Sequence, residues 1–166
     1  LRARIIERDT VFDIKLQNGI LRKGRFIPID YQEFTPYSID IPFHEDAEAV
    51  QIVDDYINQL TDGESEYKQR LLEIMAHTLI VDKEFKRMLA KFFIFVGNGG
   101  EGKGTLLMII RKILGAKNCS GLSIKQMTDE RYFSTLENKL CNLGDDVEDR
   151  AIDHEQMKII KNISTC

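Results

Sequence analysis

The sequence predicts an α/β protein, and three observations along its 166 residues support that fold class. Residues 11–29 alternate apolar and polar side chains, as the strands of a small antiparallel sheet do. Residues 46–90 carry apolar residues every three or four positions, the period of helices that bury one face. A short apolar run then leads into the stretch "GNGGEGKG" and a further helical segment, so a strand, a glycine loop and a helix follow one another.

The composition is that of a globular protein without membrane spans. Apolar residues make up 43% and charged residues 30% of the chain, and no apolar run approaches the roughly 20 residues that cross a bilayer. The three cysteines lack any C-x-x-C pair, so we expect reduced thiols in a cytoplasm. The net charge of −4 argues against a globally basic nucleic-acid binder but leaves room for a local basic groove. The chain starts "LRARIIERD", without an apolar signal segment or an initiator Met, and we expect an internal fragment.

The first predicted domain, residues 1–43, is a small β meander followed by an extended linker. The dipeptides Asn18-Gly19 and Lys23-Gly24 can both supply the positive φ that tight hairpin turns require. The segment "TPYSIDIPF" (35–43) contains two prolines, which favour extended backbone, and we expect it to be the linker.

The second predicted domain, residues 44–90, is an all-helical collar module. Its first helix is expected from Asp46 to about Thr61, and "DGE" (62–64) should end it. The apolar positions of this helix are Ala47, Val50, Val53, Ile57 and Leu60. Those of the second helix are Tyr67, Leu71, Ile74, Met75 and Leu79. A short third helix is expected over residues 84–90.

The third predicted domain, residues 91–166, contains two strands and several helices. We expect a buried strand over 91–96, a helix over 105–115 that ends at the C-cap Gly115, and a second strand over 139–144. Two further helices are expected where a serine or an aspartate is followed three residues later by a glutamine, because this is the spacing of a capping box at a helix start. These pairs are Ser123 with Gln126 and Asp153 with Gln156.

The stretch over residues 97–104, which we call the glycine loop, fits two phosphate-binding patterns. Gly97, Gly99 and Gly102 match the dinucleotide pattern G-x-G-x-x-G, whereas Gly97, Gly102 and Lys103 match the P-loop pattern G-x-x-x-x-G-K. A dinucleotide site needs an acidic residue about 20 positions later at the end of the next strand, and none is present there. The P-loop interpretation needs a lysine and a later acidic pair, which "KLCNLGDD" supplies. The P-loop is therefore favoured over a dinucleotide site and over a turn that binds nothing.

The P-loop interpretation assigns a nucleotide-binding set and a catalytic lysine. Backbone N–H groups of residues 99–104 would surround the β-phosphate of ATP, and Lys103 would bridge β- and γ-phosphate oxygens. The predicted nucleotide-binding residues are Gly97, Asn98, Gly99, Gly100, Glu101, Gly102, Lys103, Gly104 and Thr105.

The acidic pair Asp145 and Asp146 would complete the catalytic chemistry with Mg²⁺. Asp145 would hold the metal through water and Asp146 would polarise the attacking water, although the two roles could be exchanged within the pair. The alternative is that these residues form a solvated acidic turn.

An ordinary P-loop offers Mg²⁺ a hydroxyl directly after the lysine, where this chain has Gly104. We expect Thr105, or a water molecule, to complete the metal shell. The rival interpretation is a nucleotide site with weak metal dependence.

The order of these segments resembles the C-terminal half of the phage/plasmid-type primase–helicases, whose motor is a superfamily three, AAA+-type DNA helicase. The similarity runs from about Phe12 and rests on "TPYSIDIPFHEDAEAV", "GNGGEGKGTLL", "KLCNLGDDVED" and "IIKNISTC". Gly97, Gly99, Gly102, Lys103 and Thr105 fall on the Walker A loop of the family, and Asp145 and Asp146 fall on its Walker B pair. Glu101 stands where asparagine is usual and Gly104 where serine or threonine is usual, while Lys161 falls on a lysine that leads into the DNA-contacting hairpin.

The resemblance implies an ATP-dependent DNA helicase that acts in replication within a bacterial host cytoplasm. It implies a P-loop NTPase (AAA+-like) core truncated at its C-terminus and a primase domain upstream. It also implies that the full-length protein forms a homo-oligomeric ring, a hexamer, and contacts DNA largely through residues beyond Cys166. We therefore expect these 166 residues alone to hydrolyse ATP poorly and not to unwind DNA. A P-loop kinase for a small molecule and a non-catalytic nucleotide-binding assembly module are the alternatives.

Overall fold

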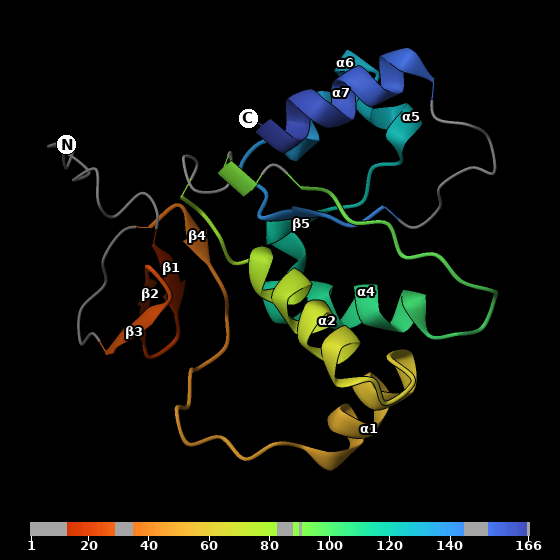
Figure 1. Ribbon diagram of the computed structural model, residues 1–166. Helices are drawn as coiled ribbons and strands as arrows, with labels where there is room; N and C mark the ends of the chain where they lie inside the picture. The colour runs from red at the N-terminus through yellow and green to blue at the C-terminus, as the bar shows by residue number, and fades with distance from the viewer. Residues whose placement is uncertain (1–12, 29–34, 83–87, 90, 145–152, 166) are drawn as a thin grey trace, which may run out of the picture.

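The computed structural model describes residues 13–28, 35–82, 88–89, 91–144 and 153–165, and it shows a mixed α/β chain (Figure 1). The strands are β1 (Ile14–Leu16), β2 (Gly19–Arg22), β3 (Arg25–Pro28), β4 (Tyr37–Ser38), β5 (Cys119–Ser120) and β6 (Cys141–Asn142). The α-helices are α1 (Gln51–Leu60), α2 (Ser65–His77), α4 (Lys103–Leu114), α5 (Ile124–Met127), α6 (Glu130–Phe133) and α7 (His154–Thr165). Two 3₁₀ turns, η2 (Ala116–Asn118) and η3 (Ser134–Leu136), complete the described elements. None of the helices in these ranges has the length and apolar character needed to cross a membrane.

The N-terminal meander is confirmed, with a different role for one of its glycines. β1, β2 and β3 pair antiparallel, and the turn between β2 and β3 has positive φ at Lys23 (50°) and Gly24 (74°), as expected. The predicted tight turn between β1 and β2 is present at residues 17–18, but Gly19, the first residue of β2, does not adopt the expected positive φ. A Cβ atom at Gly19 would instead overlap the carbonyl oxygen of Ile27 and the ring of Phe26, which means that glycine is needed there for close approach between strands.

The segment expected to be a linker contributes a fourth strand. β4 pairs in parallel with β1, so the sheet order is β3-β2-β1-β4. The N–H of Ile39 donates to the carbonyl of Lys15 over 2.8 Å, and the side-chain amide of Asn18 exchanges two hydrogen bonds of 2.7 and 2.8 Å with the backbone of Phe43. Prolines flank this strand without occupying it, which leaves its backbone N–H groups able to pair.

The first two predicted helices are present, and the first begins later than expected. α1 starts at Gln51 rather than Asp46, and Val50, which precedes it, is 60% exposed. Because the side chains of this preceding segment are exposed, burial does not stabilise a further helical turn there. Asp62 (φ 51°) and Gly63 (φ 73°) separate α1 from α2, as "DGE" predicts. The third predicted helix lies mostly outside the described residues, and residues 88–89 are helical.

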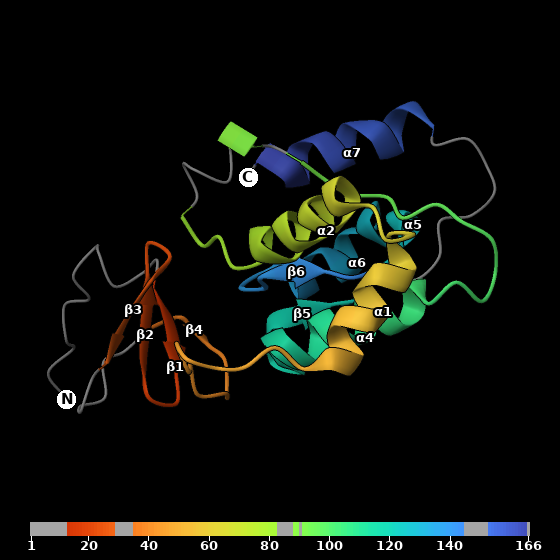
Figure 2. The same cartoon turned by 60° about the horizontal axis from the view of Figure 1, so that its bottom comes forward.

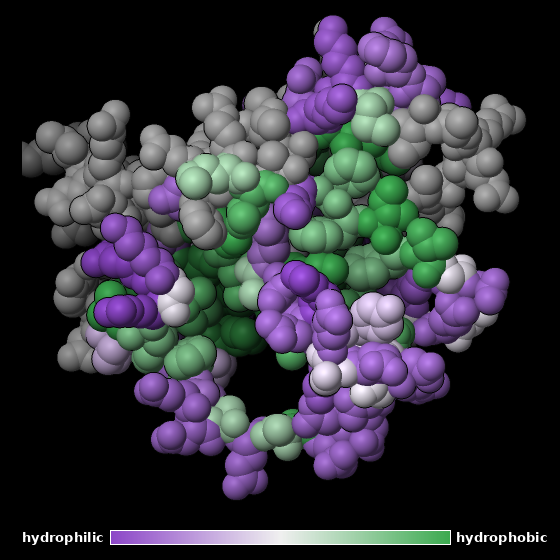
Figure 3. Space-filling model, viewed as in Figure 1, coloured by the Kyte–Doolittle hydropathy of each residue, from purple (hydrophilic) through white to green (hydrophobic). Residues whose placement is uncertain are grey.

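The buried strand predicted over residues 91–96 is wrong for this structure. The segment has no regular secondary structure: β5 and β6 pair only with each other, and no described strand pairs with it. Phe92, Ile94 and Val96 are 47%, 48% and 89% exposed, and Figure 3 shows apolar surface where Figure 1 draws the segment between α4 below and α5 and α7 above. Phe95 alone in this run packs against the core. Apolar and aromatic composition favours a strand, but a strand also needs a neighbour that supplies hydrogen bonds.

The helices that follow confirm the local signals in the sequence. α4 ends at Gly115, whose φ of 82° identifies it as the expected cap. Ser123 and Gln126 form both hydrogen bonds of a capping box at α5, and Asp153 and Gln156 do the same at the start of α7. Figures 1 and 2 both place the four-stranded sheet at one end of the molecule, beside the helices and the parallel pair β5–β6.

One core cluster includes residues from all three predicted domains. Its buried members are Ile14, Leu16, Ile39, Ile57, Leu71, Leu106, Ile110, Leu114, Cys119 and Leu140. Hydrogen bonds also join the sheet to the turn after α4: the side-chain amide of Asn118 donates to the carbonyl of Ser38 over 2.7 Å, and the ammonium of Lys117 donates to the Ser38 hydroxyl over 2.6 Å. The sheet and the helical module therefore both pack against α4.

Candidate nucleotide-binding site

The glycine loop connects the mostly exposed segment 91–96 to the first turn of α4. Gly100 (φ 83°) and Gly102 (φ 91°) both adopt the left-handed region, which glycine reaches without steric cost. Lys103 is the first residue of α4, two positions earlier than the expected helix start at Thr105. The predicted order of loop and helix is confirmed, although the segment before the loop is not a paired strand.

The first turn of α4 offers the feature that an anion site requires. The carbonyl of Gly102 accepts the N–H of Leu106 over 3.0 Å, the first hydrogen bond of the helix, so the N–H groups of residues 103–105 precede its hydrogen-bond ladder. Aligned peptide dipoles add a partial positive charge at this end. No acidic residue lies in this first turn to neutralise that charge. An anion bound here would be stabilised by both effects.

The Lys103 side chain folds back across the glycine loop. Its ammonium donates to the carbonyl oxygen of Asn98 over 2.7 Å and lies 3.3 Å from a carboxylate oxygen of Glu101. Both side chains lie against Gly97, where an added Cβ atom would overlap the Glu101 carboxylate and lie 3.0 Å from the Lys103 nitrogen. The loop therefore gathers a cation and a carboxylate around Gly97.

The Glu101 carboxyl group is held in its charged form. Hydrogen bonding to the backbone of Asn98, and then to the ammonium of Lys103, lowers the pKa of Glu101 below its usual value. A lowered pKa leaves the carboxylate ionised at neutral pH, and its pairing with Lys103 is lost only as the pH falls through that lowered pKa. Asparagine is usual at this position in the family that the sequence resembles, whereas this chain has a glutamate.

Gly104 and Thr105, the two positions of the expected metal ligand, both lie in the first turn of α4. Thr105 is exposed, so its hydroxyl is accessible from solvent. No atom lies within 4 Å of a Cβ atom added at Gly104, which means that serine would fit there. The described residues contain no group of three or more histidine, cysteine or acidic side chains able to hold a metal ion.

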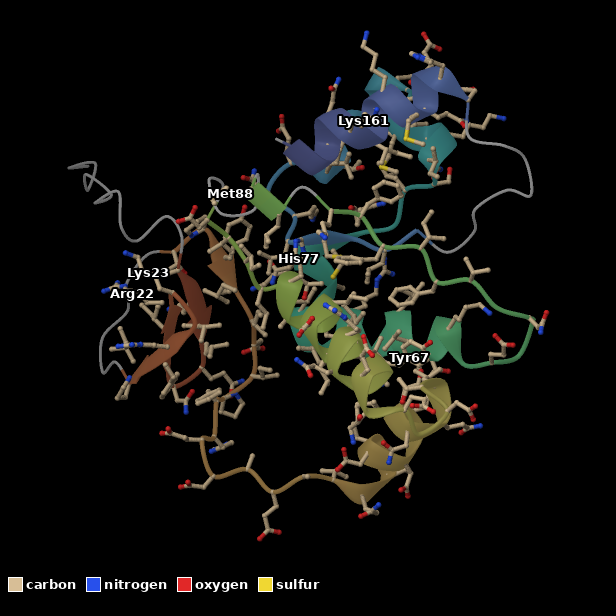
Figure 4. The ribbon with its side chains drawn as sticks, in the orientation of Figure 1. Arg22, Lys23, Tyr67, His77, Met88 and Lys161 are labelled. Carbon is tan, nitrogen blue, oxygen red and sulfur yellow. The ribbon has the colours of Figure 1, made fainter. Side chains whose placement is uncertain are left out.

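The expected acidic pair cannot be placed relative to the loop, because Asp145 and Asp146 lie outside the described residues. The strand before them is confirmed at its centre: β6 pairs in parallel with β5, and the N–H of Leu143 donates to the carbonyl of Ser120 over 2.9 Å. Lys161, the other residue assigned through the family resemblance, lies on α7 (Figure 4).

Tyr56 contacts the site and was not predicted. Its hydroxyl donates to the carbonyl of Gly102 over 2.9 Å, and burial raises the pKa of Tyr56 above its ordinary value. The apolar period of α1 identified Ile57 and Leu60 as core positions and gave no signal for a contact 46 residues away. Only the three-dimensional arrangement reveals this contact.

A family model described as a family of unknown function (DUF5906) matches residues 95–166. The match begins just before the glycine loop and includes α4, β5, β6 and α7. Its description assigns no activity. No curated protein matches the chain.

Proposed function

We propose that this chain carries the nucleotide-binding part of an ATP-dependent DNA helicase, a P-loop motor of the phage/plasmid replication type. In this proposal the glycine loop and the first turn of α4 bind the phosphates of ATP with Mg²⁺, and hydrolysis drives the unwinding of duplex DNA. The working form is a homo-oligomeric ring, with a primase domain elsewhere in the polypeptide and the DNA contacts largely beyond Cys166.

The observation that carries the proposal is the position of Lys103. Its ammonium bonds to the carbonyl of Asn98 and folds over the loop, beside N–H groups that precede the ladder of α4. A lysine at the N-terminus of a helix after a glycine-rich loop is the arrangement by which P-loop proteins bind β- and γ-phosphates. The choice of DNA unwinding over another use of ATP depends on the segments that resemble the primase–helicases.

The experiment that tests the function is ATP hydrolysis with and without single-stranded DNA. We expect the longest natural polypeptide that contains these 166 residues to hydrolyse ATP faster when DNA is added, and to unwind a forked duplex. Phosphate transfer to a nucleoside or metabolite instead of water would identify a kinase. Nucleotide binding with no turnover would identify a non-catalytic assembly module. Either of these results contradicts the helicase proposal.

The metal requirement tests the role proposed for Thr105. Thr105→Ala should raise the Mg²⁺ concentration needed for half-maximal ATP binding or turnover by roughly 3- to 10-fold, since one polar contact is worth about 1 kcal/mol. Gly104→Ser should lower that concentration, because it supplies a hydroxyl where the common P-loop pattern has one. The measurement is a Mg²⁺ titration at fixed ATP concentration.

Thr135→Ala is the matched control, since Thr135 is an exposed threonine on η3. It should leave the Mg²⁺ midpoint unchanged. If neither Thr105→Ala nor Gly104→Ser shifts the midpoint, Thr105 does not complete the metal shell.

A further inference from the structure

A contact between α1 and the glycine loop indicates a role for Tyr56 that the loop sequence does not reveal. The Tyr56 hydroxyl donates to the carbonyl oxygen of Gly102 over 2.9 Å. α1 belongs to the helical module, and Gly102 is the last loop residue before α4. The hydrogen bond therefore joins the helical module to the point where phosphate is expected to bind.

Gly102 determines how α4 begins. Its φ of 91° and ψ of 2° turn the chain into the helix, and its carbonyl oxygen also accepts the N–H of Leu106 over 3.0 Å. A carbonyl oxygen has two lone pairs, so Tyr56 and Leu106 together use its full capacity. A peptide group held by two donors has little freedom to rotate. The orientation of this peptide group sets the directions of the N–H groups of the residues that follow it.

Side-chain packing acts on the same residue as the hydrogen bond. A Cβ atom added at Gly102 would lie 3.4 Å from the Tyr56 ring and 3.4 Å from a methyl group of Leu60. α1 therefore lies directly against the backbone of Gly102. The hydroxyl and the ring of Tyr56 restrict the loop from one side, while Leu60 fills the space beside it.

We propose that Tyr56 is a positioning residue for phosphate: it holds the Gly102 peptide so that the first N–H groups of α4 keep the orientation that binds a nucleotide. This inference rests on the proposed nucleotide site. Through the same contact, any displacement of α1 changes the loop, so packing of the helical module and nucleotide affinity are coupled. Tyr56 acts through Gly102 and does not itself contact the phosphates.

The test compares Tyr56→Phe with Tyr67→Phe. Tyr56→Phe keeps the ring and removes only the hydroxyl; Tyr67 is a tyrosine of α2 that is 63% exposed, and Figure 4 shows its place on that helix. Dissociation constants for ATP and ADP are measured by titration with a fluorescent analogue, on protein shown to be folded by circular dichroism. We expect Tyr56→Phe to weaken both nucleotides by roughly 3- to 10-fold, because the Gly102 peptide would no longer be held in the binding orientation before the nucleotide arrives, and Tyr67→Phe to leave them unchanged.

Hydrogen exchange without nucleotide provides a second measurement. Exchange of the Leu106 amide, which bonds to the Gly102 carbonyl, should be faster in Tyr56→Phe than in the wild type and in Tyr67→Phe. An unchanged nucleotide affinity in Tyr56→Phe overturns the positioning role, even if the protein is less stable. Unchanged exchange at Leu106 also overturns it, because the hydroxyl would then not hold the peptide.

These outcomes are separate from those that test the function. The helicase proposal depends on whether DNA stimulates ATP hydrolysis by the wild type. The role of Tyr56 depends on the ratio of affinities between variant and wild type, which can be measured whether or not DNA stimulates turnover.

Discussion

Replacing Lys103 with alanine is expected to weaken ATP binding by roughly 10- to 150-fold. A hydrogen bond to a charged group contributes about 1.5–3 kcal/mol, and Lys103 is the cation that lies across the glycine loop. The variant also leaves the Glu101 carboxylate without its ammonium partner, and an uncompensated negative charge would repel phosphate. Equilibrium titration with ATP gives the affinity directly.

Two further variants separate these contributions. Lys112→Ala removes an exposed lysine from the last turn of the same helix and should leave ATP binding unchanged. The double variant Lys103→Ala/Glu101→Gln should recover part of the affinity, because it removes the repelling carboxylate as well. Wild-type affinity in Lys103→Ala would exclude the glycine loop as the phosphate site.

Replacing Leu114 with alanine is expected to lower the free energy of unfolding by about 2–5 kcal/mol, the usual cost of truncating a buried leucine. Leu114 is 1% exposed at the end of α4 and belongs to the core cluster that includes residues of the sheet, the helical module and β5. The cavity left by the substitution would therefore affect packing in all three regions. Urea denaturation followed by circular dichroism gives the change in stability.

Met108→Ala is the control on the same helix. Met108 is 51% exposed, and substitutions at such positions usually change stability by no more than about 0.5 kcal/mol. If Leu114→Ala and Met108→Ala were equally mild, the core would not be centred on α4.

Local signals predicted the elements whose causes lie within a few residues. The cap at Gly115 and the capping boxes at Ser123 and Asp153 are formed by neighbours in the sequence, and all three are present. The turn at Lys23-Gly24 is equally local, because its backbone angles depend on the residues that adopt them.

Non-local pairing accounts for the errors at β4 and at residues 91–96. β4 forms because β1, more than twenty residues earlier, offers it a parallel edge, and no pattern within residues 35–43 shows that edge. Residues 91–96 have the composition of a strand but no partner among the described strands. The contact from Tyr56 to Gly102 likewise depends on how α1 packs against the loop. Composition predicts what a segment favours, and the fold determines which neighbour it meets.

For the candidate site, the sequence predicted the loop, its lysine and the helix that follows. It did not predict that the Lys103 ammonium would contact the Asn98 carbonyl and the Glu101 carboxylate. The pairing of Lys103 with Glu101 depends on the course of the loop around Gly97, which brings the two side chains together. The geometry between the loop and the acidic pair Asp145 and Asp146 remains a prediction, because those residues lie outside the described part of the chain.

At the proposed site, an anionic ligand would replace the Glu101 carboxylate as the partner of the Lys103 ammonium. Lys103 is already paired with Glu101, so a phosphate bound as proposed would have to replace a carboxylate that the chain itself holds beside the ammonium. A single phosphate would have few oxygens with which to contact Lys103, whereas a di- or triphosphate would also contact the N–H groups at the start of α4. At the proposed nucleotide site, Glu101 would therefore weaken the binding of phosphate and other small anions more than the binding of a nucleotide, whose polyphosphate chain would make additional contacts.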